Sequence, residues 1–173
     1  QDWYKSAQAM AEDQRFFHWE LEFPIAFYEQ DGERKEDSGF DAVIGNPPYV
    51  RMEEFKELKN YLSQEYTTHA DRTDLYIYFI ERSTSDLLRE DGEYGAIVSN
   101  KFLRANYGAS VRSLLASATN IREITDFGGL PVFPDATVRS AILLARNTEP
   151  DGAPPRYVPV ESLDFDSLGA EVE

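Results

Sequence analysis

Hydrophobic and polar positions follow two different periods along this chain, and the changes of period predict its elements. Short apolar runs between glycine or charged residues predict strands over 41–44, 94–99, 121–126 and 138–145. Helical spacing of apolar residues predicts helices over 2–19, 52–66 and 75–89, whereas the alternation of Phe23, Ile25 and Phe27 favours a short extended piece. The succession of strand, helix and strand predicts an α/β fold with a mostly parallel sheet and a C-terminal β-hairpin.

The first strand leads directly into the sequence Asn46-Pro47-Pro48-Tyr49. Its apolar run, Ala42 to Ile44, is typical of a parallel strand that is buried on both faces. Proline cannot continue a central strand, so the backbone has to leave the sheet at its carboxyl edge, where open α/β sheets bind their ligands.

These four residues offer a specific combination of chemical groups. The Asn46 amide oxygen and the Pro47 carbonyl are hydrogen-bond acceptors, and Tyr49 adds a flat ring. Two acceptors and a ring suit an aromatic amine, whose lone pair is delocalised and therefore weakly nucleophilic. Hydrogen bonds that draw both amine protons out of plane direct the lone pair at an electrophile, which is catalysis by positioning without a general base. The alternative is a structural turn with Tyr49 as a packing residue.

Composition sets limits on the class of protein. The 173 residues, 42% of them hydrophobic, suffice for one domain with a core. Without cysteine there is no disulfide framework, thiol nucleophile or cysteine-ligated zinc, and we identify no metal-binding residues. No apolar run has the length of a membrane span and no signal-peptide pattern opens the chain, so we expect no membrane partner and a cytoplasmic location.

The net charge of −15 argues against a simple DNA-binding surface, because phosphate neutralisation requires lysine and arginine. Residues 101–146 are the exception, with six basic and three acidic groups. A DNA backbone could pass along this basic stretch. The excess of acidic residues and the low lysine content also suggest a halophilic source.

Two stretches, 17–24 (FHWELEFP) and 39–49 (GFDAVIGNPPY), resemble the adenine-specific DNA methyltransferase part of type IIG restriction-modification enzymes. The resemblance covers about residues 16–146. It implies a partial Rossmann-like fold of S-adenosylmethionine-dependent methyltransferases, with Asn46, Pro47, Pro48 and Tyr49 as the catalytic residues.

The same resemblance assigns roles further along the chain. It implies that Asp74 and Phe79, in the sequence DLYIYF, border S-adenosylmethionine; Asp74 or Thr73 could instead cap the following helix. It also implies that Phe133 stacks on a target base flipped out of the duplex, with Tyr49 on the other face. The alternative for Phe133 is a core plug.

The glycine-rich donor-binding loop of this family is not found before Asn46. We therefore expect a catalytic half over 41–146, preceded by a helix and loop over 1–40 and followed by an acidic linker or tail over 147–173. Its expected partners are double-stranded DNA, an upstream cofactor-binding half and a target-recognition domain. By itself the fragment should be inactive and bind S-adenosylmethionine weakly or not at all.

The leading functional hypothesis is methyl transfer from S-adenosylmethionine to the amino group of adenine in DNA, in a restriction-modification system. The same four residues would also serve methylation of a protein glutamine amide. A third hypothesis is a non-catalytic scaffold with a degenerate site.

Overall fold

The computed structural model describes residues 5–6, 9, 17–134 and 137–164. They belong to two compact units, 1–38 and 39–173. The helix predicted over 2–19 falls largely outside the described residues. No helix among the described residues is long and apolar enough to cross a membrane.

Residues 17–38 of the first unit contain two short helices, α2 (Trp19–Glu22) and α3 (Pro24–Phe27). The extended piece predicted from Phe23, Ile25 and Phe27 is therefore wrong. Pro24 occupies the first turn of α3, where its fixed φ and its missing N–H suit a helix start. Three alternating residues were too short a pattern to outweigh that signal.

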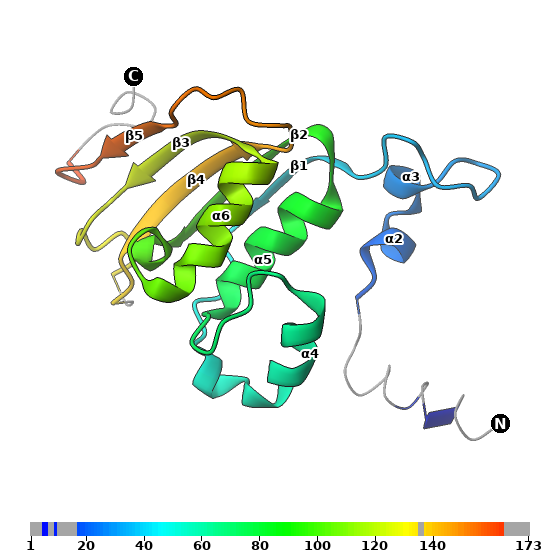
Figure 1. Cartoon of the computed structure of the whole chain (residues 1–173), viewed down its shortest axis with the longest axis horizontal. Coiled ribbons are helices and arrows are strands. Elements are labelled where there is room, and N and C mark those ends of the chain that lie inside the picture. The colour runs from blue at the N-terminus through cyan, green and yellow to red at the C-terminus, as the bar shows by residue number, and fades with distance from the viewer. Residues whose placement is uncertain (1–4, 7–8, 10–16, 135–136, 165–173) are drawn as a thin grey trace. The chain divides into compact units, whose positions relative to one another are not determined.

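The second unit is built on one five-stranded sheet in the order β1-β2-β4-β3-β5 (Figure 1). The strands are β1 (Phe40–Gly45), β2 (Leu88–Ser99), β3 (Asn120–Asp126), β4 (Ser140–Arg146) and β5 (Arg156–Pro159). The pairs β1–β2 and β3–β5 are parallel, and β4 runs antiparallel to both of its neighbours. Four of the five strands thus share one direction, and β3 and β4 form a hairpin, so the predicted α/β fold with a mostly parallel sheet is confirmed.

Two helices, α5 (Leu75–Arg82) and α6 (Ala109–Ala118), cover one face of this sheet (Figure 1). The main core lies between them and the strands and includes Tyr76, Ile77, Ile80, Val98, Val111, Leu115 and Leu143. A smaller cluster packs α4 (Lys59–Glu65) against α5 and consists of Met52, Phe55, Leu62 and Tyr78. Short 3-10 helices span Met52–Glu54, Lys56–Leu58, Asn100–Leu103 and Asn106–Gly108.

Several predicted boundaries are corrected by the structure. The helix expected over 75–89 ends in one π-helical turn, Ser83–Leu87, and β2 begins at Leu88. The helix expected over 52–66 is broken into two 3-10 turns before α4. Part of the expected tail, Arg156–Pro159, is strand β5.

The largest difference concerns β1, which we predicted to be buried on both faces. It lies at an edge of the sheet, and its Ile44 side chain is 86% exposed. Val43, on the opposite face, packs against the main core. One face of β1 is therefore covered and the other is open.

A buried carboxylate fastens the loop before α5 to that helix. Glu81 is 6% exposed and accepts hydrogen bonds from the backbone N–H and the hydroxyl of both Thr67 and Thr68. Burial raises the pKa of Glu81, but these four hydrogen bonds outweigh it and leave the pKa below its usual value. The loop thus depends on an ionised Glu81.

Glu81→Gln should lower the free energy of unfolding by about 2–3 kcal/mol, because the uncharged amide is a weaker acceptor and turns an N–H group toward donors. Because the folded pKa is lowered, this stabilisation is present above the unfolded pKa and is lost as pH falls through the folded one. Denaturant unfolding at pH 7 and at pH 3 checks both points. Glu65→Gln, at an exposed position of α4, is the matched control. An equal loss for both variants would contradict this role of Glu81.

Candidate active site

Three loops meet at the carboxyl edge of the sheet. They follow β1, β2 and β3 and begin at Asn46, Asn100 and Phe127. The strand register aligns their starting points, because Ser99 pairs with Ser140 and Asp126 with Ala141. Side chains far apart in sequence are therefore neighbours at this edge.

The two acceptors expected at the Asn-Pro-Pro-Tyr turn differ in burial, because Asn46 is exposed whereas Pro47 is a buried residue. Asn46 is exposed, and its Oδ1 atom accepts a hydrogen bond of 2.7 Å from the Tyr49 hydroxyl. That hydroxyl also lies 3.0 Å from the Ile97 carbonyl oxygen on β2. Within the described part of the chain, the Pro47 carbonyl accepts no hydrogen bond from the backbone. Among the residues that the structure describes, no backbone N–H donates to either acceptor.

Tyr49 is half-buried, and burial raises its pKa. The phenol therefore keeps its proton at neutral pH and acts as a donor toward Asn46. An amide oxygen has two lone pairs, so the Asn46 oxygen can accept a second hydrogen bond while the one from Tyr49 persists.

The structure brings Tyr49 and Phe133 together. Their ring centroids are 6.5 Å apart, and the rings are inclined by 50°. A flat base between two parallel rings needs about 7–8 Å, since each face contact takes about 3.5–4.0 Å. The two rings contact each other here, so a base can enter between them only if they separate and become parallel.

Asp74 occupies the N-cap position of α5, but its side chain makes no capping hydrogen bond. Its Oδ2 atom instead accepts one of 3.1 Å from the Tyr107 hydroxyl. Burial raises the pKa of Asp74, and the bond from Tyr107 opposes that shift only in part. Phe79, on the same helix, is 45% exposed. Their assignment to the methyl donor stays a prediction.

The sequence analysis missed a network around Asp126. Asp126 is buried and accepts hydrogen bonds from Asn100 Nδ2 at 2.7 Å, the Gly128 N–H at 2.9 Å and the Tyr157 hydroxyl at 2.8 Å. Burial raises the pKa of Asp126, but the hydrogen bonds outweigh it and leave the pKa lowered. The only signal in the sequence was a carboxylate at the end of an apolar strand.

This network connects the loops after β2 and β3 to strand β5. Asn100 Nδ2 also lies 3.2 Å from the Gly128 carbonyl oxygen, and Gly128 adopts a positive φ of 57°. Asp126 thus holds the start of the segment that carries Phe133.

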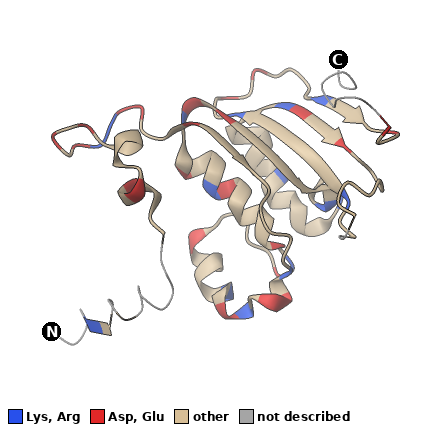
Figure 2. Cartoon of the chain, turned by 180° about the vertical axis from the view of Figure 1, so that it is seen from behind, with Lys and Arg blue, Asp and Glu red and all other residues tan. Residues whose placement is uncertain are grey.

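Acidic and basic residues are interspersed along the described chain (Figure 2). Within the predicted basic stretch, however, the cations divide between two ends of the sheet. Lys101 and Arg104 follow β2 and Arg139 precedes β4, all three exposed at the carboxyl edge. Arg122 lies toward the opposite end of the strands, 3.2 Å from Glu93.

Comparison with known proteins decides the family. Residues 1–133 match the model of the Eco57I restriction-modification methylase. This chain belongs to the Eco57I restriction-modification methylase family. A type II methyltransferase of Geobacillus stearothermophilus, M.BstVI, is 34% identical over 148 residues, which cover 84% of this chain and 26% of that protein. M.PaeR7I of Pseudomonas aeruginosa is 36% identical over 116 residues, which cover 66% of this chain and 20% of that protein.

The fold of this Eco57I-family domain is that of class I S-adenosylmethionine-dependent methyltransferases. A structure of that class from Listeria monocytogenes superposes with a TM-score of 0.58 at 18% identity, covering 83% of this chain and 44% of the other. The structure of a DrdV–DNA complex gives a TM-score of 0.52 at 19% identity, covering 72% of this chain and 15% of the other. The chain spans only about a fifth to a quarter of the length of the first relatives that it matches.

Among the described residues, no group of three or more His, Cys, Asp or Glu side chains is placed to hold a metal ion.

Asp126→Asn should loosen the start of the Phe133 loop, because one carboxylate oxygen becomes an N–H group that faces donors. We expect a loss of about 1.5–3 kcal/mol in local stability, the range for hydrogen bonds to a charged group. Hydrogen exchange of peptides covering 126–134 measures it. Asp164→Asn, at an exposed position, is the control. Unchanged protection in Asp126→Asn would contradict the anchoring role.

Proposed function

We propose that this domain transfers the methyl group of S-adenosylmethionine to the exocyclic amino group of adenine in DNA, as part of a restriction-modification system. The supporting observation is the pair of acceptors at the catalytic turn. Asn46 is exposed at the carboxyl edge, and the Pro47 carbonyl is not used by the described backbone. Family membership gives the reaction class, and the turn gives the chemistry that suits an aromatic amine.

In this mechanism the two acceptors activate the amine without removing its proton first. Asn46 Oδ1 and the Pro47 carbonyl would each accept a hydrogen bond from one N–H of the amine. These two bonds favour a pyramidal nitrogen whose lone pair is directed away from the plane of the ring. After transfer the nitrogen is cationic and acidic, so water can take the surplus proton. No general base is required.

The Tyr49 hydroxyl orients the Asn46 amide. Its hydrogen bond of 2.7 Å to Oδ1 restrains the orientation of the amide, because the NH₂ group of Asn46 could not accept a hydrogen bond from the hydroxyl. Catalysis by positioning depends on such restraint of a flexible side chain. Tyr49 would thus serve in two ways, through its hydroxyl on Asn46 and through its ring on the base.

Phe133 would complete the base site from the opposite side. It is half-buried and inclined to Tyr49, so a flipped adenine would displace it rather than enter a preformed slot. The Asp126 network restrains the beginning of its loop and leaves the ring itself to adjust.

S-adenosylmethionine, when bound, supplies an electrophilic methyl group. Phe79 fits a flat part of that molecule, since its ring is 45% exposed, and the half-buried Asp74 carboxylate lies at the start of the same helix. These two residues would form one wall of the donor site. The remaining contacts, including a glycine-rich loop, would come from the upstream part of the parent protein.

Asn46→Ala should lower the rate of DNA methylation by about 10²–10³, the range for removal of one preorganised polar group, without a change in stability. The assay follows radiolabelled methyl transfer by the parent protein to duplex DNA, with nucleoside analysis to identify the methylated base. Asn60→Ala, at an exposed position of α4, is the control. Labelled cytosine, or transfer to a glutamine peptide instead of DNA, would refute adenine as the target. Unchanged DNA methylation in Asn46→Ala would refute the mechanism.

The exposed cations at the carboxyl edge should contact DNA phosphates. Lys101→Gln and Arg139→Gln are each expected to weaken DNA binding for all sequences and to reduce the salt slope of the binding constant by about 1. Titrations of the parent protein at several salt concentrations measure this slope. Arg122→Gln, at the other end of the sheet, should leave it unchanged. Equal effects of all three substitutions would point to net charge rather than to this edge.

A further inference from the structure

The hydroxyl of Ser140, at the start of β4, has no role in the mechanism described so far. Ser140 is 0% exposed, and within the described part of the chain its Oγ atom has no hydrogen-bond partner. Buried polar groups are nearly always hydrogen-bonded, because an unpaired one loses its bonds to water without replacement. The unpaired hydroxyl therefore calls for an explanation.

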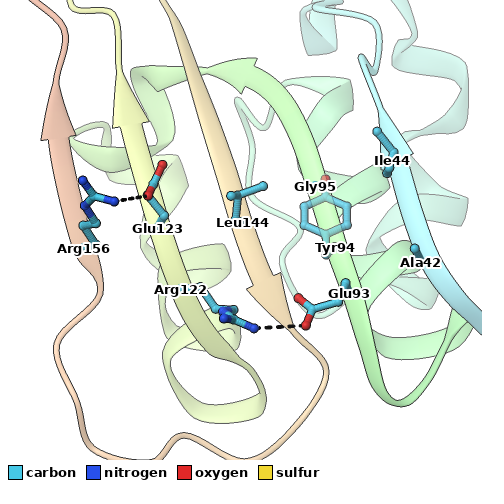
Figure 3. Close-up of a pocket in the computed structure, with 9 residues that line it drawn as sticks. All are labelled: Ala42, Ile44, Glu93, Tyr94, Gly95, Arg122, Glu123, Leu144 and Arg156. Carbon is cyan, nitrogen blue, oxygen red and sulfur yellow. Dashed lines mark hydrogen bonds and ion pairs between the residues drawn. The ribbon is translucent and has the colours of Figure 1, made fainter. Parts of the chain in front are cut away.

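Ser140 lies close to the end of β2, because β4 runs between β2 and β3 (Figure 3). It pairs with Ser99, the last residue of β2. On its other side, the N–H of Phe127 donates to the Ser140 carbonyl oxygen at 3.1 Å. Ile97, whose carbonyl oxygen lies 3.0 Å from the Tyr49 hydroxyl, is two residues before Ser99. Ser140 is thus a neighbour of the strand end that Tyr49 contacts.

The Ile97 carbonyl faces the end of β1 and not β4. The N–H of Asn100 donates to the Arg139 carbonyl at 2.8 Å, so in this antiparallel pair the even-numbered residues of β2 bond toward β4 and Ile97 faces away. If the parallel register of β1 with β2 continued, this carbonyl would accept from the N–H of residue 47. Pro47 has no N–H, and the Tyr49 hydroxyl lies in that place.

The Tyr49 hydroxyl has one proton but two acceptors, Asn46 Oδ1 at 2.7 Å and the Ile97 carbonyl at 3.0 Å. Two arrangements satisfy these groups. In the first, the proton goes to Asn46 Oδ1. In the second, it goes to Ile97, and the Asn46 amide turns over so that its NH₂ group donates to the Tyr49 oxygen. The second arrangement places an NH₂ group where the proposed mechanism requires an acceptor.

Ser140 and Tyr49 have complementary unused groups. In the hydrogen bonds of the described residues, the Tyr49 oxygen acts only as a donor, so its lone pairs are free, whereas the Ser140 hydroxyl has a free proton. Burial raises the pKa of Tyr49, and the Ser140 hydroxyl opposes that rise. A hydroxyl has this effect when it donates toward the phenolate from hydrogen-bonding range.

We propose that Ser140 is a positioning residue for the methyl transfer: its hydroxyl donates a hydrogen bond to the Tyr49 oxygen and so directs the Tyr49 proton to Asn46 Oδ1. The bond from Ser140 occupies the lone pair that a turned Asn46 amide would need. A hydroxyl that accepts a hydrogen bond also becomes a stronger donor. The effect on methylation rests on the proposed function, whereas the hydrogen bond itself can be measured without methyl transfer.

A fluorotyrosine at position 49 of the parent protein tests the hydrogen bond. Fluorine NMR follows its titration with Ser140 present and in Ser140→Ala. Loss of a donated hydrogen bond destabilises the phenolate, so the pKa at position 49 should rise in Ser140→Ala. Ser83→Ala, which also removes the hydroxyl of a buried serine, is the control and should leave that pKa unchanged. An unchanged pKa in Ser140→Ala, or an equal rise in both variants, would overturn the proposal.

A double-mutant cycle tests the consequence for catalysis. In the parent protein, Ser140→Ala should lower the single-turnover rate of DNA methylation about fivefold, the equivalent of one ordinary hydrogen bond, without a change in DNA affinity. In Tyr49→Phe, which keeps the ring but lacks the hydroxyl, the same substitution should change the rate by less than about twofold.

An equal loss of rate in both backgrounds would mean that Ser140 acts through packing, and no loss in either would mean that its hydroxyl is idle. Both results would overturn the proposal. A pKa rise at position 49 in a parent protein that does not methylate DNA at all would instead refute the proposed function and leave the hydrogen bond established.

Discussion

Two successive prolines decide where strand β1 ends and what it presents. Neither Pro47 nor Pro48 has an N–H to donate to a ladder, and both fix φ, so the chain leaves the sheet directly after Gly45. The preceding strand is held in register by its parallel pairing with β2. The acceptors of Asn46 and Pro47 are therefore held at the edge of a sheet and not at the tip of a loose loop. The rest of the proposed chemistry depends on that rigidity.

Two ionised carboxylates hold the surroundings of this turn. Glu81 fixes the loop that leads into α5, and Asp126 fixes the loops after β2 and β3. Each is buried, and each compensates the cost of burial with several hydrogen bonds from neighbouring backbone and side chains. Anchors of this kind limit motion where the loops begin. The rings of Tyr49 and Phe133 do not take part in these hydrogen-bond networks. They would have to separate to admit a base.

The two faces of the sheet are covered unevenly. One face has helices and a continuous core, whereas the other exposes isoleucine and leucine side chains. Lys101, Arg104 and Arg139 lie at the carboxyl edge, near the Asn-Pro-Pro-Tyr turn, and not on that open face. The surface proposed for DNA and the open face of the sheet are thus separate.

The sequence determined the features that depend on neighbours along the chain. The apolar runs located four strands, the prolines located the end of β1, and the residues around them identified the family, because backbone restriction and local hydrophobicity act over a few positions. The same local patterns failed for Phe23, Ile25 and Phe27, and they could not show that α5 stops at Arg82 or that β5 exists.

Only the tertiary structure decided which distant groups meet. Asp126 accepts hydrogen bonds from Asn100 and Tyr157. The ring of Tyr49 contacts that of Phe133. Asp74 accepts a hydrogen bond from Tyr107 instead of capping its helix. It also decided that β1 is an edge strand with an open face, although the run Ala42 to Ile44 within it is apolar. An apolar run reports local hydrophobicity, whereas the place of a strand in the sheet depends on pairing with strands that are distant in the sequence.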